Sequence, residues 1–414
     1  MEIQYLSQPD AEQRPQPGST RARFDAFLRS WMFRDVLIPF ITARAVLTLI
    51  GWLALQYFHN LPANPGSWEL NPAGQITTVS HLSMTSHPLL NMYSRWDAGW
   101  YHSIAKQGYS FKPGRQSNTA FFPLYPALMR AVHVFIPSDT DSSWFLAGVI
   151  ASNCAFLVAL CYLLLLLRMD FDQETSARAV LYLLVFPTAF YFFAVYGESV
   201  SLATTVAAFY YARKNNWWLA GAFAGAATLT RSPGVLLGAP LLAEYLGQRE
   251  FRWRSIRADI LSLGLIPACL IAHMLFLRWS VGNVTAIQDA QAAWGSQWGR
   301  FSAPWAPLFR LRPHPFTYFD FINVGFAGVM LVLVVLAAAR LRLSYGVYAV
   351  TGFWFITSWG TYESMPRYVI VLFPAFLILA KWGHNRAFDR AYVAVASALA
   401  ALFMTRFTLW LWVA

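Results

Sequence analysis

The sequence has 414 residues, of which 57% are apolar and only 12% are charged. Soluble globular proteins carry about twice that charged fraction, so this composition excludes an ordinary soluble domain and indicates an all-α polytopic membrane protein. The apolar runs are continuous rather than alternating, which argues against a β-barrel. The net charge of +11 does not indicate a nucleic-acid partner, because the basic residues lie in short loops between apolar runs, where they orient membrane spans.

The chain divides into a polar, basic N-terminal segment, residues 1–35, and a single transmembrane domain, residues 36–414. The N-terminal segment has no apolar h-region, so we expect no cleaved signal peptide and place it in the cytoplasm. Two long segments without spans, residues 59–142 and 279–320, are expected on the extracytoplasmic side, and the basic loop 249–257 inside. About eleven spans are expected, at about 36–58, 143–167, 178–196, 199–212, 217–230, 233–246, 258–278, 321–339, 345–359, 367–381 and 391–412.

Asp97 is an acid in the middle of an apolar stretch of the first long loop. A helix over residues 95–107 would place it on one face with apolar and aromatic side chains, namely Trp100, Tyr101, Ile104 and Ala105. A carboxylate on such a face is costly unless it is paired or used. The alternative is a helix cap, because Ser94 and Asp97 have capping-box spacing and Gly108 would end the helix. The apolar segment that follows, 120–136, contains prolines and predicts a re-entrant or interfacial helix.

Two arginines at predicted extracytoplasmic ends of spans are candidates for binding an anion. Arg231 lies in a Thr-Arg-Ser-Pro-Gly turn, and Arg367 precedes Tyr368 in a Pro-Arg-Tyr sequence. An arginine at membrane depth needs an anionic partner, and a guanidinium can hold two phosphate oxygens at once. The alternative is that each arginine pairs with a nearby acid, Glu198 or Glu363. Glu198 itself follows Tyr196 and Gly197 in a polar turn, which a second backbone or a ligand could approach closely at the glycine.

Metal or other cofactor binding is not expected. Two Asp-x-Asp patterns occur, at Asp139 and Asp141 and at Asp170 and Asp172. Such a pattern can hold a divalent metal against a nucleotide sugar, but acids near helix ends are the simpler interpretation. The three cysteines lie in apolar runs and are expected to be packing residues. The histidines of the first loop have no spacing that is typical of a metal site.

An ordered set of motifs resembles the PIG-V family, the GPI mannosyltransferase 2-like enzymes, and its shorter bacterial relatives. The first motif is Arg95-Trp96-Asp97, and the second runs from Ala120 to Pro126. The later ones are Phe186-Pro187-Thr188, Tyr196-Gly197-Glu198-Ser199, Thr230 to Gly234, and Pro366-Arg367-Tyr368. Together they extend over residues 90–375, and their order makes the resemblance more specific than any one of them.

The resemblance implies a GT-C glycosyltransferase fold with a catalytic acid in the first extracytoplasmic loop. It also implies a polyprenyl-phosphate sugar donor, typically dolichol phosphate mannose or its bacterial counterpart, and an inverting transfer to an acceptor hydroxyl. The acid carried over is Asp97, which would act as general base, while Arg231, Arg367 and Tyr368 would bind the donor phosphate. The remaining candidates for substrate binding are Arg95, Trp96, Trp100, Tyr101, Phe122, Tyr125, Tyr196, Glu198 and Glu363.

The expected partners are the donor, a glycolipid, glycan or protein acceptor, and the bilayer. The expected location is the bacterial cytoplasmic membrane, or the endoplasmic reticulum if the source is eukaryotic, with the active site on the extracytoplasmic side. Two alternatives stay open. One is a lipid or sugar transporter or flippase, because buried charges in many spans suit such proteins. The other is a membrane glycan synthase that uses a nucleotide sugar, with Asp170 and Asp172 on the cytoplasmic side.

Overall fold

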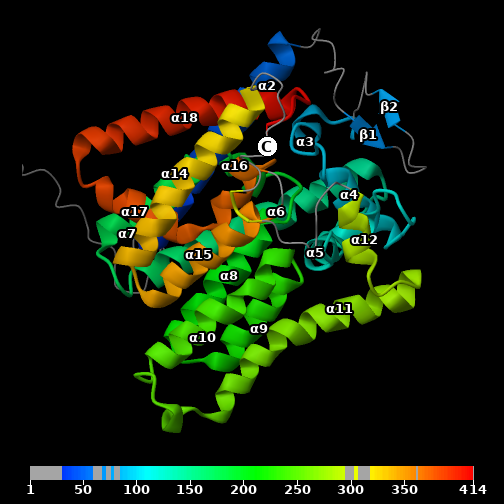
Figure 1. Ribbon diagram of the computed structural model, residues 1–414. Helices are drawn as coiled ribbons and strands as arrows, with labels where there is room; N and C mark the ends of the chain where they lie inside the picture. Colours follow the sequence, from blue (N-terminus) through cyan, green and yellow to red (C-terminus); the bar gives the residue numbers. More distant parts are fainter. Residues whose placement is uncertain are drawn as a thin grey trace, which may run out of the picture.

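The computed structural model of the chain describes residues 30–58, 68–70, 76–78, 84–293, 303–305, 318–359 and 362–413. Most of the predicted N-terminal segment, and parts of both predicted extracytoplasmic segments, therefore lie outside the described residues. The described part is helical (Figure 1) apart from one antiparallel pair of short strands, β1 (Trp68–Leu70) and β2 (Ile76–Thr78).

The helices of the first half are η1 (Met32–Leu37), α2 (Ile38–Tyr57), α3 (Pro88–Asn91), α4 (Ala98–Gln107), η2 (Asn118–Ala120), α5 (Leu124–His133), α6 (Asp141–Leu167), α7 (Gln173–Leu184), η3 (Ala189–Phe192) and α8 (Glu198–Arg213). Those of the second half are α9 (Trp217–Thr228), η4 (Ser232–Leu237), α10 (Gly238–Gly247), η5 (Trp253–Ser255), η6 (Ala258–Gly264), α11 (Leu265–Val281), α12 (Ala286–Ala292), α14 (Tyr318–Arg340), α15 (Leu343–Thr357), α16 (Met365–Tyr368), η7 (Val369–Val371), α17 (Phe373–Trp382) and α18 (Arg386–Thr408).

Five of the described helical stretches are long and apolar enough to cross a membrane, and a sixth candidate is a bent pair. The five are Met32–Tyr57, Asp141–Leu167, Ala258–Val281, Phe321–Arg340 and Arg386–Thr408. The bent pair joins Met365–Val371 to Phe373–Trp382 at an angle of 84°. The predicted count of eleven spans stays a prediction, because several expected spans are helices of 10 to 16 residues, such as α10 and α8. At 1.5 Å per residue these helices are shorter than a hydrocarbon core of about 30 Å.

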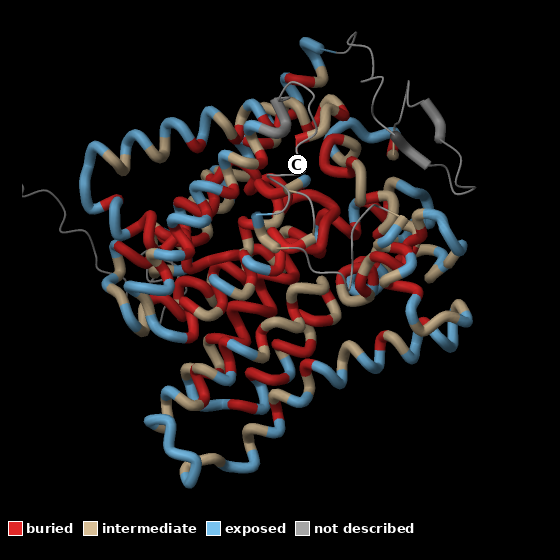
Figure 2. The backbone as a smooth tube through the Cα atoms, viewed as in Figure 1, coloured by how far each residue is buried: buried red, intermediate tan, exposed pale blue. Residues whose placement is uncertain are grey.

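A buried centre and apolar outer helices organise the fold. Helices α6, α7, α8 and α17 contribute many of the buried residues (Figure 2), and α6 packs along α8. The long helices α11 and α18 lie at the edge of the molecule (Figure 1), and α11 and α14 expose many apolar side chains. Exposed apolar surface of this extent is expected where a protein meets lipid.

Local sequence signals explain several helix boundaries. Asp172 accepts a hydrogen bond from the Thr175 amide at the start of α7, and Asn385 does the same for Ala387 in α18. Gly108 ends α4 with φ +88°, a conformation that glycine adopts without steric cost. The predicted helix over 95–107 begins three residues later than expected, at Ala98, because Trp96 has a left-handed backbone conformation. Asp97 thus immediately precedes α4.

Two expected spans are interrupted in the structure. The stretch predicted at 178–196 is α7 followed by an irregular buried segment with one short 3₁₀ turn, η3, and Pro187 lies where the helix has ended. The stretch predicted at 367–381 bends at Leu372, just before Pro374. Segment 120–136, by contrast, forms the ten-residue helix α5, which is too short to span a membrane, as its two prolines indicated.

Candidate active site

Asp97 lies at the entrance to α4, and its carboxylate is not used to cap that helix. Ser94, the other half of the predicted capping box, donates its hydroxyl to the Leu90 carbonyl instead. Asp97 Oδ2 accepts a hydrogen bond of 2.6 Å from Nη1 of Arg367, a residue 270 positions away in the sequence. The side chain of Asp97 is 23% exposed. The helix-cap alternative is therefore not what this structure forms, and the acid remains partly open to solvent.

Arg367 is held on the short helix α16 by contacts with two other parts of the chain. The side-chain oxygen of Asn323 in α14 accepts a hydrogen bond of 3.1 Å from the Met365 amide. The Thr188 hydroxyl donates a hydrogen bond of 2.7 Å to the Pro366 carbonyl. Ser364, which precedes the helix, has φ +65° and turns the chain into it. These contacts aim the Arg367 side chain at Asp97 and Glu198.

Glu198 joins Arg367 to the second arginine of the site. Its Oε1 accepts hydrogen bonds of 2.5 Å from Arg367 Nε and from Arg231 Nη1. Glu198 is completely buried at the first turn of α8, whereas Arg231 is 15% exposed just before η4. Two arginines and two acids from four distant segments thus form one chain of ion pairs, which we call the site network: Asp97, Arg367, Glu198 and Arg231.

Aromatic rings surround the guanidinium groups of the site network. The Arg367 guanidinium carbon lies 4.5 Å from the ring centre of Tyr196 and 5.3 Å from that of Tyr191. The ring of Tyr368 lies between the two arginines, 5.1 Å from Arg231 and 5.7 Å from Arg367. Such contacts attract the cations electrostatically and restrict their orientation.

The site network leaves much of its hydrogen-bonding capacity open. Two guanidinium groups carry ten N–H donors in total, and within the described residues only three of them are used, all on Glu198 and Asp97. Glu198 Oε2 is buried without a hydrogen-bond partner among the described residues. Buried polar groups in folded proteins are normally satisfied, so this arrangement suits a site that completes its hydrogen bonds with a ligand.

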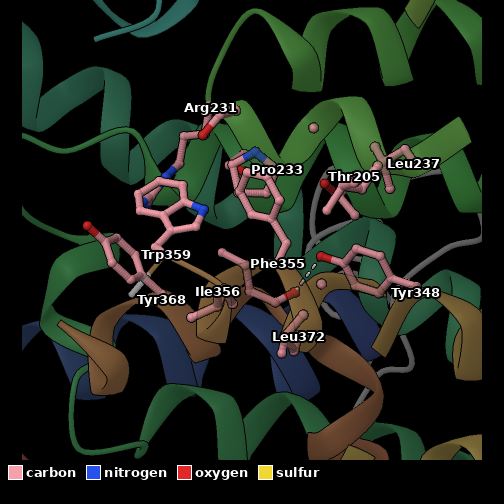
Figure 3. Close-up of a pocket in the computed structure, with 16 residues that line it drawn as sticks. Thr205, Arg231, Pro233, Leu237, Tyr348, Phe355, Ile356, Trp359, Tyr368 and Leu372 are labelled. Carbon is pink, nitrogen blue, oxygen red and sulfur yellow. Dashed lines mark hydrogen bonds between the residues drawn. The ribbon is translucent and has the colours of Figure 1, made fainter. Parts of the chain in front are cut away.

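A narrow apolar cavity begins at the site network (Figure 3). It has a volume of about 50 Å³ and runs between α8, η4, α15 and η7. Arg231, Trp359 and Tyr368 lie at one end, and Thr205, Leu237 and Tyr348 lie at the other. We call it the apolar slot. Its lining would suit a hydrocarbon chain whose charged end meets Arg231.

Other predicted site residues lie beside the site network. Tyr196 donates its hydroxyl to the Arg95 carbonyl at 2.9 Å and faces the Asp97 amide at 3.3 Å. Gly197 allows the Tyr101 hydroxyl to approach closely, since a Cβ there would lie 3.2 Å from that oxygen. Burial raises the pKa of the Tyr101 hydroxyl, so it stays protonated at neutral pH. Trp100 stacks on Phe121 at 6.1 Å between ring centres.

Phe122 and Tyr125 have packing roles in this structure. Phe122 lies against His273 of α11, 5.5 Å between ring centres, in a separate apolar cluster. Tyr125 is fully buried and donates its hydroxyl to the Gly148 carbonyl at 3.0 Å. Glu363 is exposed on the turn before α16, and neither arginine of the site network pairs with it.

Arg95 and Trp96 are held by the end of the chain. Arg95 is 1% exposed, and its Nε and Nη2 donate to the Thr408 carbonyl at 3.1 and 2.9 Å. The Trp96 ring meets the rings of Trp410 and Trp412 edge-on. Direct substrate contact therefore stays a prediction for both residues, and the structure adds a different role for them.

The second Asp-x-Asp pattern is engaged in structural contacts. Asp170 pairs with Arg213, and Asp172 caps α7. Among the described residues no group of three or more His, Cys, Asp or Glu side chains could hold a metal ion. This part of the chain therefore offers no support for the nucleotide-sugar alternative at Asp170 and Asp172.

Sequence reasoning missed three aromatic residues near the site, namely Tyr191, Trp410 and Trp412. Tyr191 lies in the aromatic segment between Pro187 and Tyr196, which looked like part of a continuous span. The two tryptophans lie at the end of the last apolar run, where the sequence analysis expected only a membrane span. Their shared signal was a cluster of aromatic rings beside a helix break.

Comparison with known proteins gives a family match in the middle of the chain. Residues 123–279 match the model of a family described as dolichyl-phosphate-mannose-protein mannosyltransferase. The matched stretch includes Glu198 and Arg231, and it excludes Asp97 and Arg367. No curated protein sequence matches the chain.

Two solved structures are distantly similar to this chain in overall fold. The oligosaccharyltransferase of Archaeoglobus fulgidus is 14% identical with a TM-score of 0.42, over 88% of this chain and 52% of that one. ArnT of Cupriavidus metallidurans is 14% identical with a TM-score of 0.45, over 89% of this chain and 75% of that one. The chain thus spans about half the length of the archaeal enzyme.

The family match agrees with the helical architecture and the apolar spans described above. It covers less than half of the chain and therefore supports the enzyme class without fixing the sugar, the acceptor or the subfamily. The predicted all-helical membrane fold is confirmed, and the family match over residues 123–279 supports the predicted glycosyltransferase class.

Proposed function

We propose that this protein transfers a sugar, in our expectation mannose, from a polyprenyl-phosphate donor to an acceptor hydroxyl with inversion at the anomeric carbon. The observation that carries the proposal is the site network beside the apolar slot. Two arginines share one carboxylate oxygen, keep most of their N–H groups open, and one of them lies at the end of a hydrocarbon-lined space. A lipid phosphate has the matching chemistry, with an anion joined to an apolar chain.

The donor phosphate would bind between Arg231 and Arg367. Seven of their ten N–H groups are unused within the described residues, so a phosphate can be bound without displacing Glu198. Glu198 then fixes the spacing of the two cations, and Tyr368 supports both from one side. The first isoprene units would enter the apolar slot, which must widen to admit them because it is narrow.

Asp97 would act as the general base. In the proposed step the acceptor hydroxyl gives its proton to Asp97, its oxygen forms a bond to the anomeric carbon, and the bond from that carbon to the phosphate oxygen breaks. The phosphate leaves with one more negative charge, while Asp97 loses its own. The two arginines meet this growing charge, so their interaction is strongest in the transition state. A lipid phosphate is a good leaving group, so a strong general acid is not required.

The expectation of mannose has two supports. The matching family is described as using dolichyl-phosphate mannose, and the ordered motifs from Arg95-Trp96-Asp97 to Pro366-Arg367-Tyr368 resemble the PIG-V enzymes. The PIG-V subfamily stays a prediction. The acceptor is proposed only as a glycolipid, glycan or protein hydroxyl, because a partly exposed Asp97 side chain is compatible with each of them.

A donor screen tests the proposal. Purified protein is incubated with polyprenyl-phosphate mannose, with polyprenyl-phosphate glucose, and with GDP-mannose, each with a hydroxyl acceptor such as a short mannoside. Mass spectrometry follows the release of polyprenyl phosphate. We expect release only from a polyprenyl-phosphate sugar, with mannose preferred, and a loss of about 10²–10⁴-fold in Asp97→Asn, as for removal of a general base.

Other results of the same screen would overturn the proposal. Turnover of GDP-mannose without a lipid donor would favour the nucleotide-sugar synthase. Movement of the intact lipid donor across proteoliposomes, without release of polyprenyl phosphate, would favour a flippase. Shortening the lipid of the donor to one or two isoprene units should raise its KM, and an unchanged KM would exclude the apolar slot as the lipid site.

The side of the membrane is a separate part of the proposal. The distribution of basic loops supports an extracytoplasmic site and a cytoplasmic N-terminus. Single-cysteine labelling should therefore reach residues 84–87 and 283–285 from outside in intact cells or spheroplasts, and residues 249–257 only after permeabilisation. Labelling of 249–257 from outside would place Asp97 in the cytoplasm and remove the basis for a donor on the outer face.

A further inference from the structure

A turn at the end of α18 holds the two residues that precede Asp97. We call it the C-terminal turn, residues 408–412. Arg95 donates twice to the Thr408 carbonyl, across 313 positions of sequence, and its guanidinium carbon lies 4.7 Å from the ring centre of Trp410. A carbonyl at the end of a helix lacks an intrahelical partner, so a buried arginine is a well-matched donor for it.

Trp96 packs against both tryptophans of the C-terminal turn. Its ring centre lies 5.5 Å from that of Trp410 and 4.9 Å from that of Trp412, with interplanar angles of 66° and 86°. Edge-to-face pairs at these distances contribute about 0.5–1.5 kcal/mol each beyond the area that they bury. Both contacts bear on the residue immediately before the acid.

The backbone of Trp96 needs such support. Its φ is +53°, in the left-handed region, which costs an L-residue with a bulky side chain about 1–3 kcal/mol. This conformation turns the chain between Arg95 and Asp97, and it determines where the Asp97 carboxylate points. The Ala98 amide closes the turn on the Arg95 carbonyl at 3.1 Å, and the rings of Trp410 and Trp412 pack on the Trp96 side chain within that turn.

The C-terminal turn is itself fixed. The Leu411 amide donates to the Arg406 carbonyl at 2.9 Å, and Arg406 Nη2 donates back to the Trp412 carbonyl at 3.0 Å. On the other side of the 95–97 segment, the Tyr196 hydroxyl meets the Arg95 carbonyl and the Asp97 amide. The segment is therefore clamped between Tyr196 and the C-terminal turn.

We propose that Trp410 and Trp412 are positioning residues, which hold the Trp96 backbone in its left-handed conformation and thereby aim Asp97 at the acceptor hydroxyl. The inference rests on the proposed role of Asp97 as general base. According to this inference, part of the rate of sugar transfer depends on a segment more than 300 positions from Asp97 in the sequence. That segment contacts neither the donor nor the acceptor in the proposed geometry.

The test measures kcat and KM for the lipid donor in Trp412→Ala, with Trp412→Phe as the conservative variant. We expect kcat to fall by about 10–100-fold in Trp412→Ala, because a misplacement of about 1 Å can cost that much. The donor KM should stay within about threefold, because Arg231 and Arg367 are untouched. Trp412→Phe, which keeps an aromatic ring, should recover most of the lost kcat. Trp279→Ala is the matched control, since Trp279 is 82% exposed on α11, and it should change neither constant.

A double-mutant cycle makes the test specific for Asp97. If Trp412 acts through Asp97, then adding Trp412→Ala to Asp97→Asn should lower the residual kcat no further, whereas independent effects would multiply. A multiplied loss, or an unchanged kcat in Trp412→Ala, overturns the inference. Should Trp412→Ala fail to fold, the same cycle with Trp412→Leu decides between these outcomes. An inactive wild type in the donor screen would instead reject the proposed function, which keeps the two failures apart.

Discussion

Two clusters, each made of two arginines and two acids, lie at opposite ends of α8. They differ in how completely their charged groups are paired. At the N-terminal end of the helix is the site network. At its C-terminal end, about 24 Å away for 16 residues, Arg213 pairs with Asp170 and contacts Glu244, and Arg342 pairs with Glu244. We call this second set the distal network: Asp170, Arg213, Glu244 and Arg342.

The two acids of the distal network are saturated. Both oxygens of Glu244 accept two hydrogen bonds each, from Arg342, Gln248 and Ser344. Asp170 accepts from Arg213 through both oxygens and from the Tyr345 hydroxyl. In the site network, Glu198 uses one oxygen, Asp97 uses one, and neither arginine is fully engaged within the described residues. The same residue types thus form a structural clamp at one end and an incomplete, ligand-ready set at the other.

The largest expected contrast is between the two aspartates. Asp97→Asn should lower kcat by about 10²–10⁴-fold, as for removal of a general base, and should lose less thermal stability than Asp170→Asn, because Asp97 accepts one hydrogen bond and Asp170 accepts three. Asp170→Asn should leave kcat near the wild-type value and lower the midpoint of thermal unfolding. Turnover and unfolding are measured on the same preparations. Near-normal turnover by folded Asp97→Asn would show that both acids are structural.

Loss of Glu244 should have the largest effect on stability. Glu244→Ala leaves Arg213 and Arg342 without their shared carboxylate. Breaking a buried ion pair costs about 3–5 kcal/mol, and the lower end applies here because the Arg342 side chain is 36% exposed. Denaturation in detergent should show this loss, while the kcat of the protein that remains folded should be unchanged. A Glu244→Ala variant that is as stable as the wild type would remove the distal network as a structural clamp.

Conservative arginine changes should separate the two networks next. Arg231→Lys and Arg367→Lys are expected to keep the fold and to lose at least about tenfold in kcat/KM, equivalent to about 1.4 kcal/mol. The reason is that a lysine ammonium is a point charge and cannot hold two phosphate oxygens in the planar geometry of a guanidinium. Arg342→Lys, the matched control, should lower stability without changing kcat/KM. Full activity in Arg231→Lys would indicate that Arg231 merely neutralises Glu198.

The smallest expected effects concern two tyrosines. Tyr368 supports the arginines through its ring, so Tyr368→Phe should change kcat/KM by less than about threefold, while Tyr368→Leu should lose the cation–π contribution of about 0.5–2 kcal/mol. Tyr345 acts through its hydroxyl, so Tyr345→Phe should cost about 1 kcal/mol of stability and leave turnover unchanged. Kinetics and denaturation of the three variants check this, and equal losses in Tyr368→Phe and Tyr368→Leu would contradict it.

The sequence alone determined the features that depend on local order and composition. The apolar runs and scarce charges predicted a helical membrane protein, and that prediction is confirmed. An acid on an aromatic face singled out Asp97, and arginines flanked by apolar residues singled out Arg231 and Arg367. Gly108 ends α4 as predicted. Each of these signals extends over a few residues, because capping, helix faces and the cost of a charge in an apolar run are local properties.

Tertiary structure decided which of these residues meet. The sequence left open whether Glu198 or Glu363 would pair with the arginines, and packing chose Glu198 for both. It could not show that the end of α18 supports Arg95 and Trp96, or that α8 carries a saturated network at one end and an open one at the other. These contacts join segments more than 30 and up to 313 positions apart. Such pairings depend on how distant helices pack against one another, and the local periodicity of the sequence does not predict that packing.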